Sequence, residues 1–221
     1  MKKQFLAVSA LMMATPAMAV DITAGGALDS QYIFRGIPQS DEKAAGSGSI
    51  DAAWDIGFYA GTWASTVDSG TGGNDGLEYD VYGGWSGDIG DFSLGAGVTI
   101  YRYTDSFDDD YNEVNLSLGW SFLSLAVDIG EYDNFGNGDQ DYQHSLLKAE
   151  YNGFFGSWGS FYDDFDGDYF SAGYGSTLTV QDQDLFDYHF TVIYSDDDLL
   201  GGSSDTNIIV GISKTFDLFS N

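Results

Sequence analysis

The chain has no cysteine and only two prolines among its 221 residues. Without cysteine it forms neither disulfide bonds nor a thiolate metal site, which excludes a disulfide-stapled secreted domain. Two histidines, His144 and His189, are too few for most metal sites built from imidazole ligands. We therefore expect neither a metal site nor a cofactor.

Basic residues are also scarce. Seven Lys and Arg stand against 35 Asp and Glu, which gives a formal net charge of −28. Such a field repels nucleic acid and concentrates cations, so we expect no nucleic-acid partner. Disordered acidic chains are poor in aromatic residues, whereas this one has 15 Tyr, 16 Phe and 5 Trp. The sequence shows no nucleophile elbow and no Ser–His–Asp order, so we expect no enzyme activity.

Long apolar runs are absent apart from a short one at the N-terminus. Residues 1–19 combine two early lysines, an apolar run from Phe5 to Ala14, and a small-residue site ending in Ala17-Met18-Ala19. This pattern is typical of a cleaved secretory signal peptide. We expect residues 20–221 to form a single domain. A membrane helix needs about 20 apolar residues, but a transmembrane β-strand needs only about 9–11 with one apolar face.

The mature chain follows a period of two almost everywhere. Between Phe92 and Tyr101, apolar residues alternate with Ser93, Gly95, Gly97, Thr99 and Tyr101, and no helical stripe is visible. This alternation indicates half-buried strands. We predict twelve, near residues 22–34, 45–53, 58–67, 77–86, 92–103, 111–120, 123–132, 142–151, 157–163, 168–178, 186–194 and 206–218.

The connections between these strands alternate in length. Short ones are expected near 54–57, 87–91, 121–122, 152–156 and 179–185, and longer ones near 35–44, 68–76, 104–110, 133–141, 164–167 and 195–205. An even number of strands with short turns at one end and long loops at the other is typical of outer-membrane barrels. We predict an all-β fold: a transmembrane antiparallel up-and-down β-barrel of about 12 strands.

Aromatic residues gather at both ends of the predicted strands, as the two membrane–water interfaces favour. At the short-turn end lie Trp54, Trp85, Trp120, Trp158, Phe92, Phe122, Phe154 and Phe155. At the long-loop end lie Tyr32, Tyr101, Tyr103, Tyr132, Tyr142, Tyr162, Tyr169 and Tyr194. We interpret both sets as belts that face the membrane.

The polar face of the strands supplies the candidate pore lining, in which acids outnumber bases. Charged rings of one sign set ion preference in wide barrels, so a pore lined in this way would prefer cations. The candidate pore-lining residues are Asp29, Gln31, Asp51, Glu78, Asp80, Glu113, Asn115, Asp128, Lys148, Glu150, Asp187 and His189.

Two further features leave alternatives open. The acids of the long loops form either a solvated surface suited to a salt-rich habitat or an electronegative vestibule that attracts cations. Arg35 either pairs with acids of the lumen or caps its strand at headgroup level and pairs with Asp41 or Glu42; the second reading is slightly favoured.

No connection is long enough to make a large plug, which favours a lumen with some opening.

Three segments carry a family resemblance. Residues 32–40 (Tyr-Ile-Phe-Arg-Gly-Ile-Pro-Gln-Ser), 57–65 (Gly-Phe-Tyr-Ala-Gly-Thr-Trp-Ala-Ser) and 78–84 (Glu-Tyr-Asp-Val-Tyr-Gly-Gly) together resemble the TorF family of proteobacterial porins, long catalogued as conserved proteins of unknown function. The resemblance covers essentially the whole mature chain and is strongest over its first third. Lys43-Ala44-Ala45 departs from the family pattern, in which Pro precedes the second strand. The resemblance implies an outer-membrane barrel with a pore role, without an established substrate.

The expected function is a cation-preferring outer-membrane channel for ions or small polar solutes in a Gram-negative bacterium. Its partners would be outer-membrane lipid, lipopolysaccharide and the solutes themselves. The alternatives are a non-conducting barrel that acts through its acidic extracellular loops, an outer-membrane enzyme, and a soluble periplasmic β-sandwich or lipocalin-like barrel. The sequence gives no clear signal for the oligomeric state.

Overall fold

A computed structural model describes residues 19–70 and 72–220, so the expected signal peptide lies outside the described residues except for its last position. The strands are β1 (Val20–Asp29), β2 (Ile33–Phe34), β3 (Ile37–Pro38), β4 (Ala45–Trp54), β5 (Phe58–Asp68), β6 (Asp75–Ile89), β7 (Phe92–Tyr103), β8 (Tyr111–Trp120), β9 (Leu123–Tyr132), β10 (Gln140–Tyr151), β11 (Phe154–Asp163), β12 (Gly167–Val180), β13 (Gln183–Ser195) and β14 (Asp205–Phe219). One 3₁₀ turn, η1, spans Asn134–Gly136.

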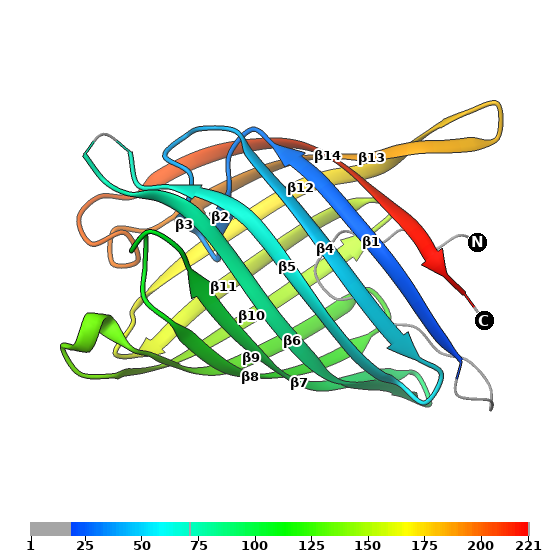
Figure 1. Cartoon of the computed structure of the whole chain (residues 1–221), viewed down its shortest axis with the longest axis horizontal. Coiled ribbons are helices and arrows are strands. Elements are labelled where there is room, and N and C mark those ends of the chain that lie inside the picture. Colours follow the sequence, from blue (N-terminus) through cyan, green and yellow to red (C-terminus); the bar gives the residue numbers. More distant parts are fainter. Residues whose placement is uncertain (1–18, 71, 221) are drawn as a thin grey trace.

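Twelve of these strands close into one antiparallel barrel (Figure 1). Each barrel strand pairs with its sequence neighbour, and β1 closes the ring by pairing with both β4 and β14. The prediction of a twelve-stranded up-and-down barrel is confirmed. No helix among the described residues has the length and apolar character needed to cross a bilayer.

The two ends of the barrel differ. We call the end with the short turns the turn side and the end with the longer connections the loop side; they lie at the right and left of Figure 1. Turns such as Asn152–Gly153 have positive φ at both central residues, as tight hairpins whose twist matches their strands require. The largest departure from the predicted strands is at β1, which ends at Asp29 rather than near residue 34.

The outer surface of the barrel carries an apolar band. Residues on one face of each strand are strongly exposed, for example Val98 at 51% and Val81 at 54%. Their neighbours in sequence turn inward and are more buried, as Glu78 and Asp80 on β6 show. The period of two therefore assigned the two faces correctly.

The turn-side aromatic belt is largely confirmed. The side chains of Trp85, Trp120 and Trp158, together with Phe92, Phe122 and Phe154, are all exposed. Phe155 was assigned wrongly, because it neighbours the outward Phe154 and so turns into the barrel, where its ring lies 5.1 Å from Lys148 Nζ.

The loop-side belt was mostly wrong. Tyr162 and Tyr194 are exposed on the outside, but Tyr101, Tyr132, Tyr142 and Tyr169 are buried and face the interior. The physical reason is that side chains alternate between the two faces of a strand. Each of these four buried tyrosines lies an even number of residues from polar lumen residues of its own strand and so shares their face. The loop-side tyrosines therefore form a core inside the barrel mouth.

Candidate functional site in the barrel lumen

The structure places the twelve candidate pore-lining residues on the inner side of the wall. Eleven lie on strands, opposite the exposed apolar residues, and Gln31 follows β1 and donates from Nε2 to the carbonyl of Ile208 at 3.0 Å. They do not form a single site. Contacts join Glu113, Asn115 and Asp128 into a group around Arg35, and they pair Asp29 with His189 and Lys148 with Glu150. Glu78 and Asp80 are successive inward residues of β6, and Asp51 and Asp187 lie apart from these groups.

The connection from β1 to β4 enters the lumen on the loop side. Its short hairpin of β2 and β3 lies within the barrel outline in Figure 1. Arg35 and Gly36 form its turn, with φ values of 49° and 84°. Positive φ at both positions is typical of a type I′ turn and is unusual for a residue other than glycine. The hairpin thus presents the Arg35 side chain to the interior.

Arg35 lies at the centre of a buried ion-pair network. Its guanidinium binds the carboxylate of Glu113 through both terminal nitrogens and that of Asp128 through Nη2 at 2.8 Å. It also lies 4.7 Å from the centroid of the Phe34 ring. The Glu113 side chain is fully buried, so this contact is far better shielded from water than a surface salt bridge. The favoured pairing of Arg35 with Asp41 or Glu42 was therefore wrong, and the inward alternative is the one observed.

Uncharged side chains donate further hydrogen bonds to the carboxylates of Glu113 and Asp128. Tyr101 and Tyr142 donate hydroxyl hydrogen bonds to Glu113 at 2.8 and 2.7 Å, and Asn115 bridges Glu113 and Asp128 at 3.0 and 2.9 Å. His144 Nδ1 lies 2.9 Å from Asp128, and its Nε2 lies 3.0 Å from the Tyr169 hydroxyl. Because nearly every polar atom in this network has a partner, the geometry around Arg35 is rigidly specified.

The hairpin is also anchored through its backbone. Ser195 Oγ donates to the Gly36 carbonyl at 2.6 Å from a fully buried position on β13. A Cβ at Gly36 would lie 2.7 Å from Tyr169 Cβ and 2.8 Å from Leu199 Cδ2. This position therefore requires glycine for its φ and for the close approach of the wall.

Aromatic rings pack beside the hairpin. Tyr132, Tyr142, Phe161 and Tyr169 form the buried cluster, and Phe165 packs on it. The rings of Tyr142 and Phe165 stack at 4.8 Å. The connection from β1 to β4 is too short to make a large plug, as expected, but its hairpin and several inward aromatic side chains lie in the loop-side lumen.

Glu78 and Asp80 form a different group on β6. Glu78 is 1% exposed and Asp80 8%. Within the described part of the chain, neither Glu78 oxygen has a hydrogen-bond partner, and neither does Asp80 Oδ1. The hydroxyls of Tyr32 and Tyr103 lie near Glu78, but without the geometry of a hydrogen bond to it.

The turn-side half of the lumen is lined differently. Its polar groups form small separate pairs: Lys148 with Glu150 at 2.7 Å, the Tyr82 hydroxyl with Asp51, and Thr177 with Asp187 at 2.5 Å. By strand alternation, much of the remaining wall consists of small residues, namely Ser49, Gly61, Gly84, Gly95, Gly97, Ser117, Ser124, Ser157, Ser171 and Gly173.

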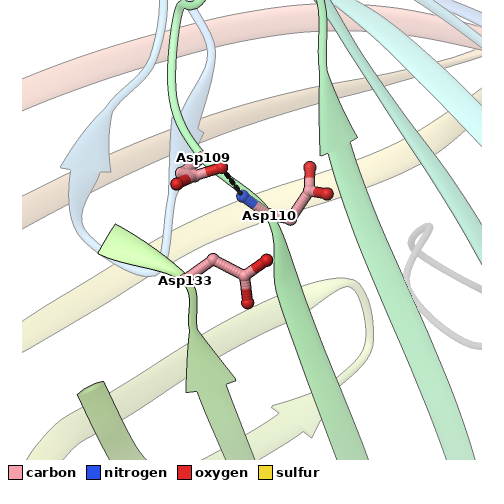
Figure 2. A group of neighbouring side chains, drawn as sticks. All are labelled: Asp109, Asp110 and Asp133. Carbon is pink, nitrogen blue, oxygen red and sulfur yellow. Dashed lines mark hydrogen bonds between the residues drawn. The ribbon is translucent and has the colours of Figure 1, made fainter. Parts of the chain in front are cut away.

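One further acidic cluster lies outside the lumen, on the loop side. Figure 2 shows Asp109 and Asp110 just before β8 and Asp133 just after β9, with carboxylate oxygens that approach within 4.8 Å of one another. Arg102 Nε pairs with Asp110 at 3.0 Å. Partial burial raises the pKa of the Asp110 carboxyl, Arg102 opposes this, and the two neighbouring aspartates add to the rise. The cluster is partly neutralised by the protein itself.

Sequence reasoning missed the aromatic and histidine members of the Arg35 network. The signal was present for Tyr101, which alternation places on the same face as Thr99, and for His144, which shares its face with Lys148. No comparable signal linked Arg35 to Glu113 and Asp128, which lie 78 and 93 residues away in sequence.

Comparison with known proteins agrees with this architecture. The family model described as "bacterial protein of unknown function (Gcw_chp)" matches residues 13–163. No curated protein matches the chain. The KdgM porin, alone and in complex with disordered oligogalacturonate, superimposes with a TM-score of 0.53 over 89% of this chain and 99% of that chain, at 10% sequence identity. At that identity the likeness concerns the fold, a closed twelve-stranded barrel of the outer-membrane porin type.

Proposed function

This chain belongs to the Gcw_chp family of bacterial proteins of unknown function, and we propose that it is an outer-membrane porin that lets ions and small polar solutes diffuse, with a preference for cations. The observation that carries this proposal is the separation of the two faces of the wall. Its outer face is a continuous band of exposed apolar side chains, and its inner face is polar and charged. A water-filled passage through a bilayer requires this arrangement. The resemblance to TorF porins supports the same function.

The charge of the lumen favours cations. Eight acids of the inner face stand against two bases, Arg35 and Lys148, and Arg35 is already engaged. KdgM has been seen with oligogalacturonate, whose sugar units carry carboxylates. An acidic lumen repels such anions, so we do not extend that solute to this chain.

The location follows from the same two faces. We place the protein in the outer membrane of a Gram-negative bacterium, exported by its signal peptide, with lipid around the apolar band. Cations would bridge the acidic loops to lipopolysaccharide at the cell surface. The hairpin of β2 and β3 narrows the passage on the loop side.

The decisive experiment is electrical. Refolded residues 20–221 in a planar bilayer under a salt gradient should give discrete current steps with a reversal potential that favours cations. Changing Glu78, Asp80 and Glu113 to Gln, Asn and Gln should lower that preference. If these substitutions leave the ion selectivity unchanged, the loops rather than the lumen would determine it.

The facing of the strands has a separate test. An arginine at Val98 or Leu116 would meet the hydrocarbon and should cost about 2–4 kcal/mol of folding free energy in lipid vesicles. An arginine at Ser117, the inward neighbour of Leu116, is the matched control and should cost far less. Equal costs at Leu116 and Ser117 would contradict the assignment of faces.

A second function is favoured by the hairpin and the buried aromatic cluster on the loop side of the lumen. A barrel closed by the hairpin and its aromatic neighbours would act as a surface binding protein through its acidic loops. A folded, heat-modifiable barrel that stays electrically silent would support this function and overturn the porin.

A further inference from the structure

The described lumen contains one pair of buried acids that makes no ion pair. The Arg35 guanidinium attracts both carboxylates from a distance, but it is bound to Glu113 and Asp128. Glu78 and Asp80 lie two residues apart on the inner face of β6, and three of their four carboxylate oxygens are buried without a hydrogen-bond partner. Burying an unpaired carboxylate is costly, so such atoms call for an absent proton, ion or ligand. Two and three strands further along the wall, on β8 and β9, the other acid pair, Glu113 and Asp128, binds the Arg35 guanidinium.

Three of the four residues opposite this pair on the neighbouring strands are aromatic. In the strand register, Asp80 lies opposite Trp63 on β5 and Tyr101 on β7, while Glu78 lies opposite Ser65 and Tyr103. Directly opposed side chains of an antiparallel pair have Cβ atoms about 5 Å apart. Tyr32 adds a fourth ring, packed on Trp63 at 5.5 Å.

Two carboxylates next to aromatic rings also surround the guanidinium of Arg35. There, two carboxylates bind a guanidinium, tyrosine hydroxyls support one carboxylate, and the Phe34 ring lies 4.7 Å from the cation. Carboxylates together with aromatic faces favour guanidinium and alkylammonium groups. We propose that Glu78 and Asp80, with Trp63, Tyr101 and Tyr103, form a binding site for the guanidinium or ammonium group of a solute. This inference rests on the proposed porin function and names its solute class.

Two observations distinguish this site from a metal centre. Among the described residues, the acidic group with three mutually close ligand atoms is the one at Asp109, Asp110 and Asp133, and Glu78 and Asp80 have no such third member. Ca²⁺ takes about 6–8 oxygen ligands, which two carboxylates alone do not supply. A monovalent organic cation instead uses the rings as well as the charge.

The approach to the site is from the turn side. Asp80 is the more exposed of the two acids and lies one inward position closer to the turn-side half of the lumen than Glu78 does. A cation arriving along that half therefore meets Asp80 first.

The experiment measures binding in detergent, where no current is needed. Methylguanidinium is titrated into refolded residues 20–221, and tryptophan fluorescence is followed. By strand alternation Trp63 faces the lumen, whereas Trp85, Trp120 and Trp158 are exposed on the outside. A saturable change is expected, with binding at least tenfold weaker in the Glu78→Gln, Asp80→Asn double variant.

The matched control removes the same two charges from the outer face of the loop side. Glu131→Gln with Asp141→Asn, both exposed, should keep the wild-type response, and heat-modifiable migration checks folding of each variant. A Trp63→Phe variant should lose the fluorescence change, and isothermal calorimetry should then still detect binding. Magnesium and potassium are titrated in parallel.

The outcomes separate this inference from the porin proposal. An unsaturable response, an equal response in the Glu78 and Asp80 double variant, or binding of magnesium in place of methylguanidinium would overturn the site. A barrel that conducts but does not bind methylguanidinium keeps the porin and loses the site. A silent barrel that binds it keeps the site and loses the porin.

Discussion

The loop-side and turn-side halves of the lumen are built on the same twelve strands but differ in their contents. On the loop side, a hairpin brings Arg35 to Glu113 and Asp128, and a buried cluster of tyrosine and phenylalanine rings packs beside it. On the turn side, small residues line the wall and charged groups pair in twos, such as Lys148 with Glu150. The comparison teaches that the twelve strands set the diameter of this barrel, while the connection from β1 to β4 decides which contacts form inside its loop-side half.

The largest expected difference in unfolding free energy is between substitutions of the two basic lumen residues, Arg35 and Lys148. Arg35→Ala leaves two buried carboxylates unpaired and should destabilise the barrel by about 3–5 kcal/mol. Lys148→Ala breaks a pair whose side chains are 27% and 31% exposed, and should cost about 0–1 kcal/mol. Urea unfolding in lipid vesicles measures both. Equal costs would remove the distinction between a structured and an open half.

Two tyrosine hydroxyls give the next comparison. Tyr142→Phe removes a buried donor to Glu113 and should cost about 1.5–3 kcal/mol, as is usual for hydrogen bonds to charged groups. Tyr82→Phe removes the donor to Asp51, which keeps Ser49 Oγ as a partner at 2.9 Å, and should cost about 0.5–1.5 kcal/mol. The same unfolding assay applies, and a larger loss at Tyr82 than at Tyr142 would reverse the ranking of the halves.

Two glycines give the smallest of these effects. Gly36→Ala combines a positive φ with contacts of 2.7 and 2.8 Å and should cost about 1–3 kcal/mol. Gly119→Ala on the turn side meets Ser93 Cβ at 3.4 Å, an ordinary contact, and should stay within about 0.5 kcal/mol of wild type. If Gly36→Ala were neutral, the hairpin would not be held tightly against Tyr169 and Leu199.

Much of the wall could be predicted from the sequence, because a strand's period of two is a local property. Strands such as 92–103 and 111–120 were predicted with the bounds that the structure shows. The facing of Glu78, Asp80 and Glu113 followed from the same alternation.

The contents of the loop-side lumen could not be predicted in this way. The contacts of Arg35 and the hydrogen bond from Ser195 to Gly36 join residues 78 to 159 positions apart, and no local pattern records them. The loop-side tyrosines were misassigned for another reason. Position near a strand end was given more weight than parity, although Tyr101 shares its face with Thr99.

The acidic loops differ from the lumen in how their charges are balanced. Lys43 contacts Asp41 and Asp68 at an exposed position. The carboxylates of Asp197, Asp166 and Asp196 raise the pKa of Asp198, because like charges disfavour its ionised form. The loops thus remain largely uncompensated, as a surface that concentrates cations would be.

The most direct test of a passage limited on the loop side is single-channel conductance of the wild type beside Arg35→Ala and Ser117→Leu. We expect small cation-preferring steps in the wild type, clearly larger steps once Arg35 no longer holds the hairpin, and little change from a bulkier residue at Ser117. Folded barrels with equal conductance in wild type and Arg35→Ala, or a greater effect at Ser117, would contradict this account.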